Sequence, residues 1–171
     1  FGGTCMNIGC IPTKTLIHDA ELVRNIRNAG QRGIKVSKPD VDIKKILQNK
    51  NEVIGKLSQG IYGLLVSNGI DIFEGSGEVI ENGKIEITLK TEDENVQIQY
   101  EKLIIATGSK PILPKIEGID DRGIYSSAEL MNAEEIPEHL LIIGGGAIGC
   151  EFATIYKAFG SKVTVVEAMP R

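Results

Sequence analysis

The sequence lacks the features that mark several common classes of protein. Only three of its 171 residues are cysteine, too few for the disulfide framework of a small secreted domain, so a reducing, intracellular setting is favoured. Lys and Arg (19) do not outnumber Asp and Glu (23), so no basic excess favours nucleic-acid binding. The longest apolar stretch, residues 140–150, is interrupted by glycines and is far shorter than the roughly 18 residues of a membrane span.

What the chain does have is the composition of a folded domain and an uneven distribution of glycine. Apolar residues make up 42% and charged residues 25%, which argues against disorder. Of the 20 glycines, many fall within residues 2–9 and 144–149. The two runs therefore become the first candidates for functional loops.

Local patterns predict an α/β protein. Helical spacing of apolar residues predicts helices from Pro12 to about Gly30 and over residues 41–66. From Ile70 the apolar period changes to two, and Asn82-Gly83 is a typical hairpin turn, so we expect an antiparallel β-meander with a polar tip at residues 92–95. The run Leu103-Ile104-Ile105-Ala106 is apolar throughout, which predicts a buried strand.

The last segment has the pattern of half a nucleotide-binding βαβ unit. A strand over residues 140–143 is followed by a glycine turn, a helix over residues 147–159 and a second strand over residues 163–167. Pro111, Pro114 and Gly118 precede this segment and indicate a linker. The most favoured domain boundary therefore falls there.

Two cysteines near the start of the chain lie next to a predicted helix N-terminus. Cys5 and Cys10 are separated by four residues, and Pro12 marks the first turn of the helix. Unpaired N–H groups at a helix N-terminus favour a thiolate at Cys10, and Lys14 adds a positive charge one turn later. Gly9 lets the intervening loop fold back so that the two sulfurs can meet. This arrangement favours a reversible disulfide beside an electron acceptor.

Other interpretations of these cysteines carry less weight. Two buried structural thiols would not explain the surrounding glycines. A zinc site of Cys5, Cys10 and His18 lacks a fourth ligand and the usual short cysteine spacing. A thioredoxin-type motif has only two residues between its cysteines.

The run over residues 2–14 resembles the redox-active disulfide motif of the class I pyridine nucleotide-disulfide oxidoreductases, the family that includes dihydrolipoamide dehydrogenase, glutathione reductase and mercuric reductase. The resemblance implies that Cys5 exchanges with the substrate, that Cys10 lies against the flavin of FAD, and that Lys14 lies near the flavin ring. It also implies FAD contacts from Thr107, Gly108 and Ser109, which follow the predicted strand at 103–106. Gly77 matches a family glycine at the adenine of FAD, with Gly75 as a near competitor.

The glycine turn after residue 143 predicts a second dinucleotide site. Gly144, Gly146 and Gly149 fit the G-x-G-x-x-G fingerprint between a strand and a helix, where the pyrophosphate rests on the helix N-terminus. Glu167 follows the next strand and is placed to bind a ribose 2′-hydroxyl, which favours NAD over NADP. Glu151 either lines the nicotinamide side or complements the helix dipole. The expected NAD contacts are Gly144, Gly145, Gly146, Ala147, Ile148, Gly149 and Glu167.

The remaining candidates have simpler interpretations. Cys150 is expected to be a small buried residue without redox chemistry. His18 is expected to pack or form a hydrogen bond, and His139 to be a solvated loop residue.

Taken together, the resemblance implies an incomplete two-dinucleotide-domain (Rossmann-like) fold. Residues 1–113 would belong to an FAD-binding domain lacking its first βαβ unit and residues 114–171 to a linker and half of an NAD-binding domain, with the dimerisation domain absent. An internal fragment of this kind is expected to be inactive alone.

For the whole protein, the resemblance implies oxidation of dihydrolipoamide by NAD, through the Cys5–Cys10 disulfide and FAD. Its partners would be dihydrolipoamide, free or on a lipoyl domain of a 2-oxo acid dehydrogenase or glycine cleavage complex, and a second subunit in a homodimer. We expect no nucleic acid, membrane or metal, and a cytoplasmic location (the mitochondrial matrix in a eukaryote). The alternatives are a mercuric reductase or related flavin disulfide reductase, and a nucleotide-binding redox sensor without turnover.

Overall fold

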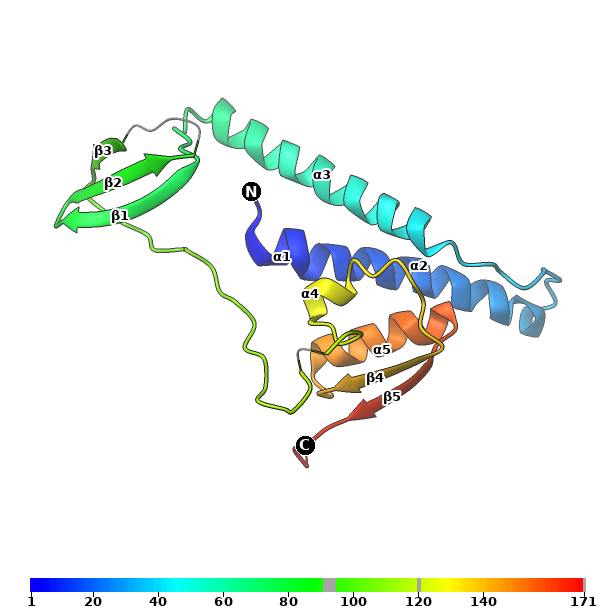
Figure 1. The fold of residues 1–171 in the computed structure, drawn as a ribbon. Coiled ribbons are helices and arrows are strands. Elements are labelled where there is room, and N and C mark those ends of the chain that lie inside the picture. Colours follow the sequence, from blue (N-terminus) through cyan, green and yellow to red (C-terminus); the bar gives the residue numbers. More distant parts are fainter. Residues whose placement is uncertain (91–94, 120, 171) are drawn as a thin grey trace. The chain divides into compact units, whose positions relative to one another are not determined.

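The computed structural model of the chain describes residues 1–90, 95–119 and 121–170. The chain divides into two compact units (Figure 1). Unit 1 comprises Phe1–Gly60 and Lys110–Arg171, and unit 2 comprises Ile61–Ser109.

Unit 1 is built from helices and a two-stranded parallel sheet. Its elements are α1 (Gly3–Ile8), α2 (Cys10–Asn28), the 3₁₀ helix η1 (Ala29–Arg32), most of α3 (Ile43–Ser67), α4 (Ser127–Leu130), β4 (His139–Ile143), α5 (Ala147–Phe159) and β5 (Lys162–Val166). Within this unit, α5 lies between α2 and the β4–β5 sheet (Figure 1).

The β4–α5–β5 segment confirms the predicted βαβ unit. β4 and β5 pair in parallel, with Leu140 opposite Val163. Helix α5 buries the side chains that recur every three or four residues, and these pack against α2, α3 and the residue after α4. The buried cluster consists of Leu16, Ala20, Val23, Leu47, Met131, Phe152, Ile155, Tyr156 and Phe159. Burial of this apolar stripe holds α5 in place within unit 1. The glycine turn, which leads directly into α5, is positioned with it.

Unit 2 holds the predicted antiparallel meander. Its strands are β1 (Gly75–Glu81), β2 (Lys84–Leu89) and β3 (Asn95–Gln99), in that order across the sheet. The hairpin turn at Asn82-Gly83 is confirmed, and Gly83 has a φ of 83° that favours glycine. Of the predicted polar tip at residues 92–95, residues 92–94 lie outside the described residues, and Asn95 begins β3.

Several predicted boundaries differ from the structure. Helix α2 begins at Cys10 rather than at Pro12, and the helical path continues through η1 past Gly30 to Gly33, whose φ is 80°. The long helix α3 ends where expected, before Asn68 and Gly69. Ile70 precedes the first strand, which starts only at Gly75.

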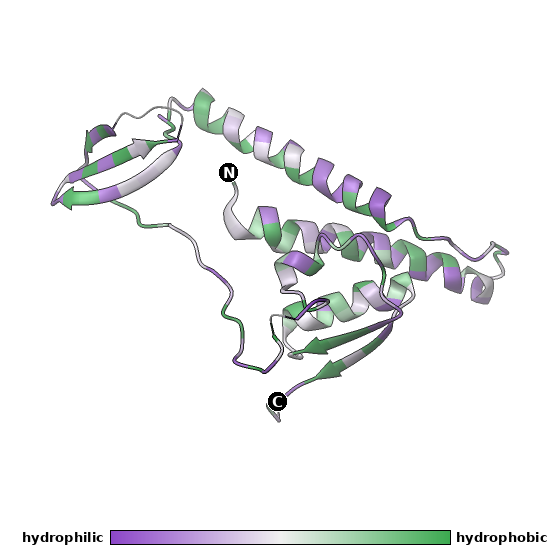
Figure 2. Ribbon diagram, viewed as in Figure 1, coloured by the Kyte–Doolittle hydropathy of each residue, from purple (hydrophilic) through white to green (hydrophobic). Residues whose placement is uncertain are grey.

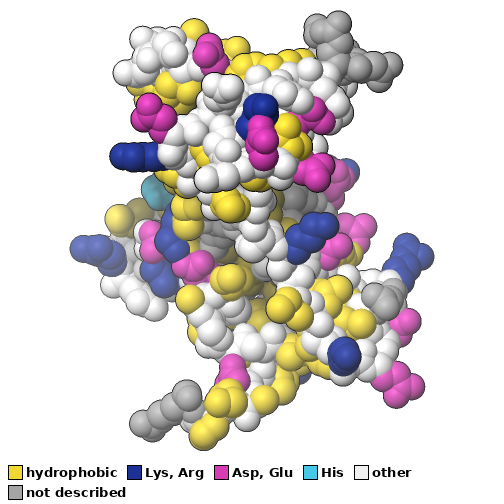
Figure 3. Space-filling model, turned by 90° about the vertical axis from the view of Figure 1, so that its left-hand side faces the viewer, with side chains coloured by type: hydrophobic (Ala, Val, Ile, Leu, Met, Phe, Trp, Pro, Cys, Tyr) yellow, Lys and Arg dark blue, Asp and Glu magenta, His cyan; other side chains and the backbone are white. Residues whose placement is uncertain are grey.

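The prediction of a buried strand at residues 103–106 is wrong for the structure. This segment is not a strand, and Ile104 and Ile105 are 88% and 76% exposed. A buried strand needs neighbours on both edges and cover on both faces. Within the described residues, the only parallel sheet is β4–β5, and this segment does not join it. Other apolar side chains also reach the surface, and Figure 3 shows many of them on one face.

Helix α3 is fixed to the α4 region by a buried lysine. Lys50 is 1% exposed, and its Nζ donates to the carbonyl oxygen of Met131 (2.9 Å) and to Oδ1 of Asn132 (2.7 Å). Helix α4 itself begins with a capping box between Ser126 and Glu129. Of the helices in the described ranges, none has the length and apolar character needed to cross a lipid bilayer.

Candidate functional site

The two N-terminal cysteines lie on either side of a glycine break between two helices. Cys5 is inside α1 and Cys10 is the first residue of α2, so the expected loop between them is a helical turn interrupted at Gly9. A Cβ atom at Gly9 would lie 2.9 Å from the Thr4 carbonyl oxygen and 3.2 Å from Cys5 Cα. Only glycine therefore permits this close approach of α2 to α1 without a backbone shift.

Both thiols are free and exposed, and they lie within hydrogen-bond reach of each other. The hydrogen bond with the Cys10 side chain raises the pKa of Cys5, and the charge of Cys10 raises it further. The proton is thus retained at Cys5, while the 19-residue helix α2 presents its positive end to Cys10. This arrangement keeps the proton on Cys5 beside the first residue of α2.

The short helix α1 is fastened to the chain before it. The Asn7 side-chain amide donates to the carbonyl oxygens of Phe1 and Gly3, each at 2.9 Å. Met6 is buried and packs against Gly2 so closely that a side chain at Gly2 would overlap it. These hydrogen bonds and the Met6–Gly2 contact therefore hold helix α1, which contains Cys5, in place.

Lys14 forms an ion pair with Glu151, which joins the cysteine-bearing helix to the second turn of α5. The Lys14 side chain is 62% exposed and that of Glu151 29%, so solvent limits the pair's contribution to stability to about 1 kcal/mol or less. Its effect is instead geometric, because it links the helix that begins at Cys10 to the helix that follows the glycine turn. No local pattern in the sequence indicates this pairing.

The residues that follow Lys14 on α2 form no metal site. His18 is exposed, while Asp19 Oδ2 is buried without a hydrogen-bond partner. Burial raises the pKa of Asp19, and the nearby His18 charge opposes that rise. Across residues 1–90, 95–119 and 121–170, no group of three or more His, Cys, Asp or Glu side chains is arranged to hold a metal ion.

The glycine turn after β4 has a backbone geometry that requires glycine at two positions. Gly144 has a φ of 107°, and a Cβ atom at Gly149 would lie 2.1 Å from the Gly144 carbonyl oxygen. Gly149 therefore allows α5 to pack against the end of β4. A Cβ at Gly146 would meet no atom within 4 Å, so the space in front of the α5 N-terminus is open.

Glu167 is held at this turn. Its Oε2 accepts from the Gly145 N–H at 2.7 Å, and its Oε1 accepts from the Met169 N–H at 2.8 Å. These backbone hydrogen bonds, from Met169 first and then from Gly145, lower the pKa of Glu167. The structure thus brings together the glycine turn and the acidic residue expected to bind ribose, and the carboxylate is charged at neutral pH.

An open cleft adjoins the turn. Its volume is about 1440 Å³, and its walls include Gly144, Gly146, Ala147, Ile148 and Gly149, together with parts of the connection over residues 111–125. A cleft of this size exceeds the roughly 300–1,000 Å³ of a typical small-molecule site. It therefore leaves room at the glycine turn and the helix N-terminus for a ligand as large as a dinucleotide.

The expectation that Cys150 is buried is wrong. This residue is exposed on the first turn of α5, where its Sγ donates to the Gly145 carbonyl oxygen at 3.2 Å. Cys150 does not belong to the buried apolar stripe of this helix, which begins at Phe152. His139 is exposed as expected, but it lies in β4 and its Nε2 is 2.8 Å from Thr164 Oγ1 on β5.

The remaining flavin candidates lie in unit 2. Gly77 is in β1 opposite Ile87, and Thr107, Gly108 and Ser109 are exposed after the meander. Gly108 has a φ of 84° and open space around its Cα, which fits a backbone that a cofactor approaches closely. Cys5, Cys10 and Lys14 belong to unit 1, so the expected FAD contacts are divided between the two units.

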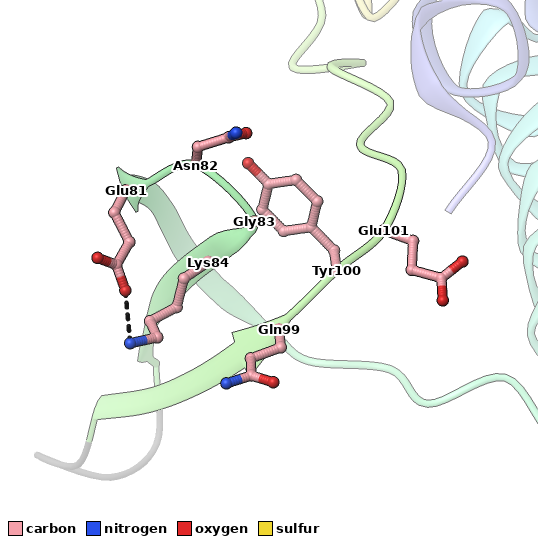
Figure 4. Close-up of a pocket in the computed structure, with 7 residues that line it drawn as sticks. All are labelled: Glu81, Asn82, Gly83, Lys84, Gln99, Tyr100 and Glu101. Atoms are coloured by element: carbon pink, nitrogen blue, oxygen red, sulfur yellow. Dashed lines mark ion pairs between the residues drawn. The ribbon is translucent and has the colours of Figure 1, made fainter.

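Unit 2 also has a small polar pocket at its hairpin end, with a volume of about 350 Å³ (Figure 4). Its lining includes the Tyr100 ring and an ion pair of 2.6 Å between Lys84 Nζ and Glu81 Oε1. None of the sequence-predicted site residues lines this pocket. Its lining comes from the β1–β2 hairpin turn and from Gln99, Tyr100 and Glu101.

The sequence profile of the family described as pyridine nucleotide-disulphide oxidoreductase matches residues 1–171. The chain belongs to this family. It is 42% identical over 168 residues to a dihydrolipoyl dehydrogenase of Buchnera aphidicola, covering 98% of this chain and 35% of that protein. The family consists of flavin disulfide oxidoreductases.

Solved structures of a second relative have the same fold. The HOCl-induced flavoprotein disulfide reductase RclA of Escherichia coli superposes with a TM-score of 0.80 at 39% identity, over all of this chain and 35% of that one. The Cu(II) complex of RclA superposes with a TM-score of 0.77 at the same identity, over all of this chain and 34% of that one. The chain thus spans about a third of the length of these relatives.

Proposed function

We propose that the protein is an FAD-dependent, NAD-linked disulfide oxidoreductase that oxidises dihydrolipoamide through Cys5 and Cys10. The observation that carries this proposal is the thiol pair at the N-terminus of α2, where Cys10 is the first residue of the helix and Cys5 lies in α1 on the other side of Gly9. Sequence identities of 42% and 40% to two dihydrolipoyl dehydrogenases, each over 98% of this chain, support the choice of substrate.

The two cysteines perform the exchange as a disulfide that opens and closes. A substrate thiolate attacks Sγ of Cys5, the Cys5–Cys10 bond breaks, and the electron pair leaves on Cys10 as a thiolate. The second substrate thiol then attacks the substrate sulfur of the mixed disulfide and releases Cys5, whose raised pKa favours capture of the proton. Cys10, which receives the electron pair, is the first residue of α2 and so lies at the positive end of the helix dipole.

Two groups would be held by residues on the chain. Lys14, Gly77, Thr107, Gly108 and Ser109 would hold FAD, which supplies an acceptor for the electron pair and a hydride donor to NAD. The glycine turn and Glu167 would hold NAD, and the Glu167 carboxylate would reject a 2′-phosphate. The proposed domain division remains residues 1–113 for FAD and 114–171 for the linker and NAD, in a cytoplasmic homodimer.

A second candidate is favoured by one specific observation. One of the similar solved structures is a Cu(II) complex of RclA, which favours as the alternative a flavin disulfide reductase that acts on a metal ion, such as mercuric reductase. In that case the dithiol would bind and reduce a thiophilic ion instead of a disulfide substrate.

Steady-state assays of the full-length protein separate the two candidates. Dihydrolipoamide with NAD, and NADH with Cu(II) or Hg(II), would be tested for turnover. We expect dihydrolipoamide-dependent formation of NADH, lost in both Cys5→Ser and Cys10→Ser. Reduction of metal ions without oxidation of dihydrolipoamide would favour the second candidate.

A further inference from the structure

One stretch of unit 1 has a charge opposite to that of the rest of the chain. Residues 24–45, here called the basic segment, contain seven Lys and Arg against two Asp, whereas the whole chain contains 19 against 23. The remainder is therefore strongly acidic. The cations of the basic segment are Arg24, Arg27, Arg32, Lys35, Lys38, Lys44 and Lys45.

The fold gathers these cations at one end of unit 1. The chain leaves η1 through a turn in which the Gly33 N–H donates to the Gly30 carbonyl oxygen at 3.0 Å, and it then runs without regular structure to the start of α3. Asp42 Oδ1 accepts from the Lys45 N–H at 3.1 Å and caps that helix. Hydrophilic residues are frequent at this end (Figure 2).

The central cations of the basic segment are not used by the fold. Arg27 donates to the Ala158 carbonyl oxygen, and Lys44 pairs with Glu134 at 3.6 Å. Within the described part of the chain, Arg32, Lys35 and Lys38 are exposed and form no ion pair. Exposed Ile34 (58%) and Val36 (53%) lie between them. Positive and apolar side chains thus alternate on an exposed stretch.

We propose that the basic segment docks a compact acidic protein domain that carries the disulfide substrate. The statement that this domain carries the substrate rests on the function proposed above. Seven cations against two Asp make the basic segment complementary to an acidic surface, and the exposed Ile34 and Val36 add apolar contact that the surface of a folded domain can match. A small domain can contact the basic segment alone, because charges beyond about 8–10 Å are screened at physiological salt.

The position of the basic segment suits a carrier rather than the reacting group itself. Helix α2 has 19 residues and a rise of about 1.5 Å per residue, so its two ends lie roughly 27 Å apart. Cys10 opens this helix and the basic segment begins near its other end. A domain docked there would leave the thiols free, and it would raise the effective concentration of a substrate tethered to it.

The test uses the full-length, flavin-loaded protein and a recombinant lipoyl domain of acidic net charge. The variant Lys35→Glu/Lys38→Glu is compared with Lys56→Glu/Lys90→Glu, which makes the same charge change at exposed positions elsewhere. At low salt we expect a roughly tenfold rise in KM for the dihydrolipoyl domain in the first variant only. Its kcat, and its KM for free dihydrolipoamide, should stay within twofold of the wild type.

Direct titration of the lipoyl domain separates this proposal from the proposed function. If the wild type oxidises neither form of the substrate but binds the domain, and Lys35→Glu/Lys38→Glu weakens that binding, the docking surface stands and the proposed reaction fails. An unchanged KM and Kd in that variant overturn the docking surface. If the protein binds vesicles of 30% phosphatidylserine in phosphatidylcholine but does not bind the lipoyl domain, the basic segment is a membrane-binding surface, and the docking proposal is overturned as well.

Discussion

Replacing Lys50 by methionine tests how helix α3 is fixed to the α4 region. The substitution Lys50→Met keeps the length of a side chain that is 1% exposed, but it deletes the donor to the Met131 and Asn132 oxygens. Two hydrogen bonds from a charged group contribute about 1.5–3 kcal/mol each. Methionine removes the cost of burying an ammonium group, which offsets much of that loss. We expect a net loss of about 1–3 kcal/mol of unfolding free energy at pH 7.

The size of this loss should depend on pH. Burial lowers the pKa of Lys50 below its ordinary value of 10.5. Between the lowered pKa and 10.5 the unfolded chain binds more protons than the folded one, so the stability of the wild type rises with pH. Lys50→Met lacks this rise. The difference in stability between wild type and variant should therefore grow from pH 7 towards pH 10.

Denaturant titration of the full-length protein at pH 7 and pH 9.5 measures both effects. Lys56→Met is the matched control, because Lys56 is exposed on the same helix, and it should change stability by about 0.5 kcal/mol or less. A difference for Lys50→Met that shrinks as pH rises would refute the reasoning. So would a control that is equally destabilised.

Three further predictions concern the glycine turn and two carboxylates. Gly149→Ala places a Cβ 2.1 Å from the Gly144 carbonyl oxygen and should lower the unfolding free energy by about 1–3 kcal/mol. Gly146→Ala places its Cβ in open space, so it should leave the unfolding free energy unchanged and weaken NADH binding. Equal denaturation midpoints for the two variants would contradict this prediction. Glu167→Gln removes stability that is present above the ordinary pKa of 4.5 and is lost as pH falls through the lowered pKa, so melting temperature should depend less on pH below 4.5 than in the wild type. Asp19→Asn removes a carboxyl group that has one buried, unpartnered oxygen and a raised pKa. The free-energy cost of this group to the wild type grows as pH rises above 3.8. The variant's melting temperature at pH 7 should therefore equal or exceed that of the wild type, and a clear drop would contradict the prediction.

Patterns with a local cause could be predicted from the sequence. The βαβ unit follows from an apolar strand, a glycine turn and an amphipathic helix that are contiguous in the chain, and helix α5 has the predicted bounds. The antiparallel meander follows from alternation and the Asn82-Gly83 turn. The Cys5–Cys10 motif was visible because both cysteines, the glycine between them and the helix start lie within six residues.

Features that depend on contacts between distant segments could not be predicted. Lys14 and Glu151 are 137 residues apart, and no local pattern indicates which acid a lysine will pair with. A lysine such as Lys50 is expected at the surface. The fold buries it because its helix packs beside the Met131 carbonyl oxygen and Asn132 Oδ1, which accept hydrogen bonds from it. The apolar run at 103–106 predicted burial, but burial also requires neighbouring strands, and the described residues provide none there.

The redox role of the two N-terminal cysteines is tested most directly by differential alkylation. Cys150 is an internal control, since it is an exposed free thiol. In the oxidised full-length protein, iodoacetamide should label Cys150 but neither Cys5 nor Cys10. After anaerobic reduction by the substrate, mass spectrometry should find the label on all three. If Cys5 and Cys10 are labelled equally before and after reduction while the enzyme turns over, they do not form the redox pair.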